Sequence, residues 1–102
     1  MERQFGNKIR LLREQNNLLL RQVAALLEMD TAQLSKIERG ERLARKDTVL
    51  QISEIYKVAA NELLTFWLAD QIYDVIKDED AALDAMIVAE ENVKYSIIKN
   101  KK

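Results

Sequence analysis

The sequence contains no cysteine, no histidine and no proline, and it has only two glycines and few aromatic residues. Without cysteine the chain can form no disulfide bond and supply no thiolate ligand or nucleophile. Without histidine it lacks the commonest general base and the commonest metal ligand. We therefore expect no catalytic residues, no metal site and no cofactor, and an enzyme is the least favoured class of protein. The scarcity of proline, glycine and aromatic residues favours an all-α fold.

Long apolar segments are also missing. The first ten residues, MERQFGNKIR, are polar and do not form the apolar centre of a signal peptide. No apolar run approaches the roughly 20 residues that a membrane-spanning helix needs. We expect a cytoplasmic protein with no membrane partner, and 102 residues amount to about one domain.

Charge is distributed unevenly along the chain. Residues 1–57 contain 11 Lys and Arg against 8 Asp and Glu, a net charge of +3, whereas residues 58–102 contain 5 against 9, a net charge of −4. A basic half favours contact with a polyanion, and an acidic half favours a different task, such as binding a partner protein. Ordinary scatter of surface charge explains the asymmetry equally well, so charge alone does not decide between them.

The spacing of apolar residues predicts a series of helices. Phe5, Ile9 and Leu12, for example, share one face of the first helical segment. The breaks fall at QNN, EMD and KDED, where asparagine suits a helix end and acids suit a helix start. The expected helices cover residues 2–15, 19–27, 30–40, 46–57, 61–77 and about 80 to the high nineties.

The segment DTAQLSKIERG has the marks of a complete short helix. Asp30 can cap its start, with Gln33 as the reciprocal partner of a capping box, and Gly40 can end it in the left-handed conformation. Leu34 marks its buried side, and Glu38, four residues later, shares that side. A carboxylate among core positions needs a partner inside the protein.

The opposite side of this helix is small, polar and cationic. It carries Ala32, Ser35, Lys36 and Arg39 at successive steps of three, one and three residues, and no acid. This helix and the one before it are short and joined by three residues, which describes a helix-turn-helix whose second helix enters the major groove of DNA. A solvated face on an ordinary helical hairpin accounts for the shape equally well.

The segment LRQVAALLEMDTAQLSKIERGER resembles the Cro/lambda-repressor-like (XRE-type) helix-turn-helix transcriptional regulator family. Val23 and Ala24 stand at the family's Leu-Ala step, and SKIERG matches its Ser-x-Ile-Glu-x-Gly ending. The resemblance covers about residues 5–66. It implies a five-helix lambda-repressor-like DNA-binding domain over residues 1–66, followed by a C-terminal helical extension over residues 67–102 with one additional helix.

The resemblance also implies which residues contact DNA. Base reading falls on Thr31, Ala32, Gln33 and Lys36, although Gln33 is equally suited to capping its own helix. Phosphate binding falls on the start of the second helix, the end of the third helix and the loop that follows, which here supply Arg21, Gln22, Arg39, Arg42, Arg45 and Lys46. The outward-facing position of Ser35 adds its hydroxyl as a further candidate for phosphate binding.

Two structural expectations accompany this resemblance. In the family, the counterpart of Glu38 pairs with an arginine of the first helix, which corresponds to Arg13 here, so we expect an Arg13–Glu38 ion pair inside the domain. The family usually has glycine at the turn position that Glu28 occupies. If Glu28 adopts the left-handed conformation of that glycine, it costs about 1–2 kcal/mol.

The last helix has a heptad-like seam of Leu83, Met86, Glu90, Val93 and Ile97. This seam can pack against the fifth helix of its own chain, or it can form a dimer interface together with that helix. The candidates for a dimer interface are Trp67, Leu83, Met86, Val93 and Ile97. Acids at positions 70, 74 and 78 repeat every four residues and are expected on a solvated face.

These features predict a sequence-specific DNA-binding transcriptional regulator, a repressor acting as a homodimer on a palindromic site in double-stranded DNA. One alternative is an antitoxin-type regulator whose acidic C-terminal half binds a partner protein. The other is a helix-turn-helix that serves only as a protein-interaction module. Both regulators should bind DNA with a steep salt dependence, because phosphate contacts release counterions, whereas the protein-interaction module should not.

Overall fold

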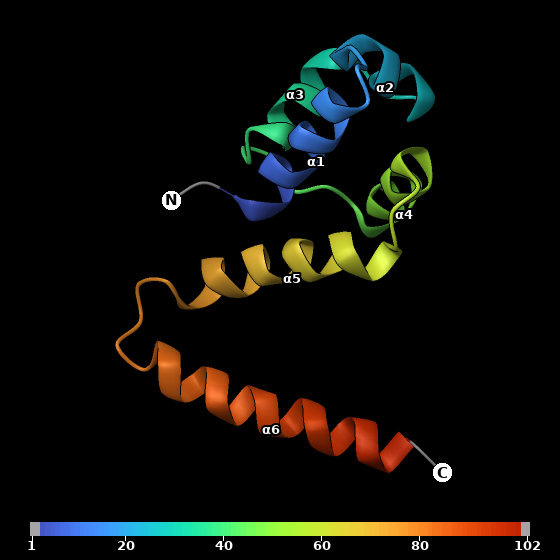
Figure 1. The fold of residues 1–102 in the computed structure, drawn as a ribbon. Helices are drawn as coiled ribbons and strands as arrows, with labels where there is room; N and C mark the ends of the chain where they lie inside the picture. The colour runs from blue at the N-terminus through green and yellow to red at the C-terminus, as the bar shows by residue number, and fades with distance from the viewer. Residues whose placement is uncertain (1–2, 101–102) are drawn as a thin grey trace. The chain divides into compact units, whose positions relative to one another are not determined.

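The computed structural model describes residues 3–100 of the chain. These residues form six α-helices and no strand (Figure 1), which confirms the all-α class. Each helix with a described start begins within two residues of its expected position. The helices are α1 (Gln4–Gln15), α2 (Leu20–Leu26), α3 (Thr31–Glu38), α4 (Lys46–Tyr56), α5 (Ala60–Ile76) and α6 (Ala82–Asn100). The expected start of the first helix, at residue 2, lies outside the described residues.

The chain divides into two compact units, residues 1–71 and residues 72–102. The division falls inside α5, after Gln71, so the whole of the expected DNA-binding region, residues 1–66, belongs to the first unit.

The first unit is built around one apolar core to which α1 to α5 all contribute. Each helix supplies side chains from one face, and Ile9, Val23, Leu34, Ile52 and Leu63 are each at most 1% exposed. Burial of a side chain of this size stabilises the fold by roughly 1.5–3 kcal/mol. Because α3 packs against both α1 and α2, the core sets the orientation of α3 within the unit.

Four helices of this unit end in the same way. Asn17, Glu28, Gly40 and Lys57 follow α1, α2, α3 and α4 with φ between 55° and 76°, which is the left-handed conformation. After each of them, the next backbone N–H donates to a carbonyl five residues back, as in the Schellman motif. Glycine and asparagine suit this position, whereas Glu28 and Lys57 hold it at a conformational cost.

The start of α1 is capped by a residue far away in the sequence. The Asp70 carboxylate, on α5, accepts hydrogen bonds from the backbone N–H groups of Gln4 and Phe5, each at 3.0 Å. Asp70 is only 8% exposed. The expectation that the acids at 70, 74 and 78 share a solvated face is therefore wrong for Asp70. A carboxylate also suits the positive end of the helix dipole, so α5 fixes α1 electrostatically as well as by packing.

Trp67 has a role inside the first unit. Its indole Nε1–H donates to the carbonyl oxygen of Ala44 at 2.8 Å, and its ring packs against the core. Ala44 is buried in the loop between α3 and α4, so Trp67 holds this loop against α5.

The second unit contains the end of α5 and the whole of α6. No residue of α6 is buried. Its large apolar side chains are 45–76% exposed, and they are Leu83, Met86, Ile87, Val88, Val93, Tyr95, Ile97 and Ile98. No helix within residues 3–100 combines the length and the apolar character needed to cross a membrane.

Candidate nucleic-acid interface

The two sides of α3 differ as their sequence predicts. Leu34, Ile37 and Glu38 are buried, at 1%, 3% and 8% exposed. The α3 outer face, which we define as Thr31, Ala32, Ser35, Lys36 and Arg39, is exposed except for the half-buried Ser35. This face carries two cationic side chains and no carboxylate, so it can approach a polyanion without repulsion from its own helix.

A bidentate ion pair joins the end of α3 to α1. Arg13 Nε donates to Glu38 Oε2 at 2.8 Å, and Arg13 Nη2 donates to Glu38 Oε1 at 3.0 Å. The Glu38 side chain is 5% exposed and the Arg13 side chain 15% exposed. Arg13 Nη1 also donates to the carbonyl oxygen of Leu18 at 3.1 Å. One guanidinium therefore ties α1, the chain that enters α2, and α3 together, and Glu38 has its partner.

This pair changes the acid–base properties of its surroundings. The hydrogen bond to Glu38 raises the pKa of the Arg13 guanidinium, against the opposing effect of burial. Burial raises the pKa of the Tyr56 hydroxyl to about 12, and the negative charge of Glu38 adds to this increase. The Tyr56 hydroxyl therefore stays neutral beside the ion pair at any ordinary pH.

The start of α3 settles one of the two roles considered for Gln33. Asp30 accepts a hydrogen bond from the backbone N–H of Gln33 at 2.8 Å, which is the expected N-cap. The Gln33 side chain does not complete a capping box, because within the described residues its amide makes no hydrogen bond. Gln33 is half-buried beside the α3 outer face. Its amide thus keeps its donors and acceptor for an external group.

The residues expected to bind phosphate are all exposed, apart from the half-buried Ser35. Arg39 forms an exposed ion pair with Glu41 at 3.3 Å. On α2, Gln22 Oε1 accepts a hydrogen bond from the Leu19 backbone N–H at 2.7 Å. This bond is half of a capping box, since a leucine side chain has no oxygen to supply the other half. The exposed members of the set are Arg21, Gln22, Arg39, Arg42, Arg45 and Lys46.

The turn between α2 and α3 keeps the left-handed conformation in spite of its glutamate. Glu28 has φ 55°, its N–H donates to the Ala25 carbonyl at 3.1 Å, and the next N–H donates to the Ala24 carbonyl at 3.0 Å. The turn therefore has the geometry that glycine would adopt, and the exposed Glu28 side chain points a carboxylate into solvent beside the two helices.

Sequence reasoning missed a group of polar residues on α1 and at its N-cap. Arg3, Asn7 and Arg10 line a small cavity together with Glu38 and Arg39 at the end of α3. The available signal was their spacing of four and three residues, which places them on one face next to the helix's buried stripe. Nothing in that spacing pointed to the end of α3, because this contact depends on how the two helices pack.

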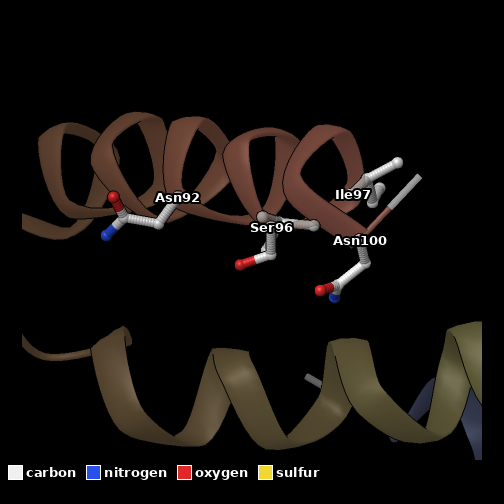
Figure 2. A pocket seen from close by; sticks show the side chains of 5 residues that line it. Asn92, Ser96, Ile97 and Asn100 are labelled. Atoms are coloured by element: carbon white, nitrogen blue, oxygen red, sulfur yellow. The ribbon is translucent and has the colours of Figure 1, made fainter. Parts of the chain in front are cut away.

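The expected dimer residues lie in different surroundings. Trp67 is engaged with Ala44 in the first unit, whereas Leu83, Met86, Val93 and Ile97 are exposed on α6. Figure 2 shows Asn92, Ser96 and Asn100 projecting from one side of α6, where they line a shallow hollow with Val93 and Ile97. Apolar and polar side chains thus border each other on this exposed helix.

An all-α domain in which α2 and α3 form a helix-turn-helix, with a cationic outer face on the second of these helices, is the architecture of a lambda-repressor-like DNA-binding domain. Residues 4–66 match the helix-turn-helix domain family, and the chain belongs to this family, in its XRE/Cro-like group. The resemblance inferred from SKIERG and the preceding helix is thereby confirmed. No curated protein matches the chain in a sequence comparison.

Proposed function

We propose that this protein is a sequence-specific transcriptional regulator that represses by occupying a palindromic DNA site as a homodimer, in the cytoplasm. The observation that carries the proposal is the α3 outer face. It is exposed, cationic and free of acids, and its opposite side is held to α1 by the Arg13–Glu38 ion pair. An exposed helix surface that is held rigidly from behind suits insertion into the major groove.

Base reading is assigned to the first turns of α3 and to Lys36. The ammonium of Lys36 can donate to guanine O6 and N7, the Gln33 amide can bond adenine, and the methyl groups of Thr31 and Ala32 can contact thymine. Phosphate binding is assigned to the exposed basic residues of α2, of the end of α3 and of the following loop. These residues orient the domain on the duplex and give binding its salt dependence.

Dimer formation is assigned to α6. Its large apolar side chains are exposed and lie on several sides of the helix, and a helix of that kind is normally covered by protein. Two recognition helices on one face of DNA lie about 34 Å apart, which is one helical turn. A second copy of the chain would bury the apolar side chains of α6 and would also supply the second recognition helix. Sedimentation of the wild-type chain at tens of micromolar, without DNA, should give a dimer, and Met86→Asp should give a monomer. A wild-type monomer would contradict this part of the proposal.

The DNA-reading assignment is tested by selection of binding sites from random duplexes, followed by substitution of Lys36. The selected sites should be palindromes with half-sites about one helical turn apart. Lys36→Glu should abolish binding to them, while circular dichroism stays helical. Lys57→Glu makes the same change in charge at an exposed residue after α4 and should retain binding. If Lys36→Glu still binds the selected site, the assignment of the α3 outer face is wrong.

A second candidate function is that of an antitoxin-type regulator whose C-terminal half binds a basic partner protein. The net charge of −4 over residues 58–102 and the exposed apolar side chains of α6 favour it. A neighbouring gene whose product is toxic, and is neutralised when this chain is co-expressed, would support this function. If a chain ending at residue 77, which lacks α6, neutralised the toxin equally well, a role of α6 in this binding would be excluded.

A further inference from the structure

A small polar cavity adjoins the α3 outer face. It lies between the first turns of α1 and the end of α3, and its volume is about 180 Å³. Sites for drug-sized ligands usually measure about 300–1,000 Å³, so this cavity has room only for a small group. Arg39 belongs both to the cavity wall and to the α3 outer face, so the two surfaces are continuous.

The lining of the cavity contains more basic than acidic side chains. Three of its five lining residues, Arg3, Arg10 and Arg39, carry guanidinium groups. Its one acid is Glu38, both of whose carboxylate oxygens already accept hydrogen bonds from Arg13, so their negative charge is compensated from the protein side. A guanidinium presents a planar set of donors that matches the oxygens of a phosphate group. The cavity therefore favours an anion of that shape.

Asn7 holds one of these guanidinium groups in place. Its side-chain oxygen accepts a hydrogen bond from Arg10 Nη2 at 3.0 Å. Asn7 and Arg10 lie three residues apart on α1, so they are neighbours on the helix surface. The other N–H groups of Arg10 are left for a second acceptor. Positioning of a long side chain by a neutral residue lowers the entropy lost when it binds a ligand.

The two glycines of the chain shape this region. A Cβ atom at Gly6 would lie 2.5 Å from the Glu38 carbonyl oxygen, so only glycine lets α1 pack directly on the end of α3. A Cβ atom at Gly40 would collide with the side chain of Arg3. Both contacts bring the start of α1 and its N-cap residue to the end of the recognition helix. Gly6 provides close approach alone, whereas Gly40 also supplies the left-handed conformation that ends α3.

We propose that this cavity binds a phosphate group of the DNA backbone, next to the stretch that α3 reads, with Arg10 and Arg39 as its main ligands. The inference rests on the proposed function and extends the DNA footprint to α1. Arg39 is paired with Glu41 across exposed surface, and such pairs contribute little, so a phosphate can replace the carboxylate at small cost. Arg10, on α1, and Arg3, at the N-cap of α1, then contribute charge from a part of the domain that otherwise has only a structural role.

The test compares the salt dependence of binding to a selected duplex for the wild-type chain, Arg10→Gln, Arg10→Lys and Lys8→Gln. Lys8→Gln is the matched control, because Lys8 is a cation of the same helix that pairs with Glu62 and lies outside the cavity. Each neutralised phosphate contributes about 0.9 to the slope of log K against log salt concentration. Arg10→Gln should lower the slope by about 0.9 per bound domain, whereas Arg10→Lys and Lys8→Gln should leave it nearly unchanged.

A scan with single uncharged methylphosphonate linkages locates the phosphate. One position in each half-site should weaken binding of the wild-type chain but not of Arg10→Gln. If Arg10→Gln and Lys8→Gln give equal slopes and no linkage separates them, the cavity does not bind phosphate. If the wild-type chain itself binds duplex DNA without salt dependence, the proposed function fails instead. Circular dichroism of each variant distinguishes both outcomes from loss of folding.

Discussion

Removal of the Glu38 carboxylate is expected to destabilise the first unit severely. Glu38→Ala removes both carboxylate hydrogen bonds of the Arg13 guanidinium, and the Arg13 side chain is only 15% exposed in the native protein. Loss of one partner of a buried pair typically costs about 3–5 kcal/mol. Arg13 keeps its bond to Leu18 and some access to water, so we expect the lower end, about 3 kcal/mol. For a domain of this size, that loss corresponds to a fall in melting temperature of roughly 12–24 °C.

The measurement is urea unfolding at pH 7, followed by circular dichroism and by the fluorescence of Trp67. The two signals should give the same midpoint, because Trp67 packs against the core that Glu38 helps to close. Glu38→Gln retains the size of the side chain, so its loss of stability measures the contribution of the carboxylate charge to the free energy of unfolding. The double variant Arg13→Met with Glu38→Leu removes both charges, so it should be more stable than the sum of the single losses predicts.

The result that would refute this reasoning is a loss below about 1 kcal/mol for Glu38→Ala, which is the value expected of an exposed pair. Coupling near zero in the double-variant cycle would lead to the same conclusion. Glu38 would then be buried for another reason, and the rigid support of α3 would have to come from apolar packing alone.

Three further outcomes are expected. Glu28→Gly should stabilise the fold by up to about 1 kcal/mol in urea unfolding, since relief of a left-handed non-glycine residue outweighs the added chain entropy; a loss of stability would contradict this. Asp70→Asn should lower the free energy of unfolding by about 1–3 kcal/mol, because the amide oxygen can accept only one of the two N–H bonds at the start of α1. The control Asp78→Asn, at an exposed position, should change it by less than about 0.5 kcal/mol. The usual pKa of tyrosine is about 10, and the pKa of Tyr56 in the fold is about 12, so the fold favours the protonated hydroxyl. The free energy of unfolding should therefore fall as the pH rises from about 10 to about 12. Tyr56→Phe should remove this part of the decline.

Much of the fold was accessible from the sequence because it depends on local chemistry. The period of the apolar residues located all six helices, and it separated the buried Leu34 and Ile37 from the α3 outer face. Asn17 and Gly40 could be assigned to helix ends because asparagine and glycine tolerate the left-handed conformation. The SKIERG motif identified the family because it combines a core position, a paired carboxylate and a terminal glycine within six residues.

Other features depended on residues that lie far apart in the chain. Asp70 caps a helix 65 and 66 residues away, and its spacing from Asp74 resembled that of a solvated face. Trp67 is a candidate interface residue by sequence, and the hydrogen bond from its indole to the carbonyl of Ala44 is a contact that the sequence did not indicate. In both cases the side chain's type and helical position are compatible with solvent, and only the packing of α5 on the rest of the unit supplies a buried partner.

By itself, the sequence determined the helices, their ends, the helix-turn-helix and the polarity of its two faces. These properties follow from side-chain periodicity and backbone preference, which act over a few residues. The tertiary structure decided which charges are paired, which helix starts are capped from a distance, and which arginines meet around the cavity beside α3. Those outcomes depend on close approach between helices, at Gly6 for example, and a one-dimensional pattern does not contain the distance between two packed surfaces.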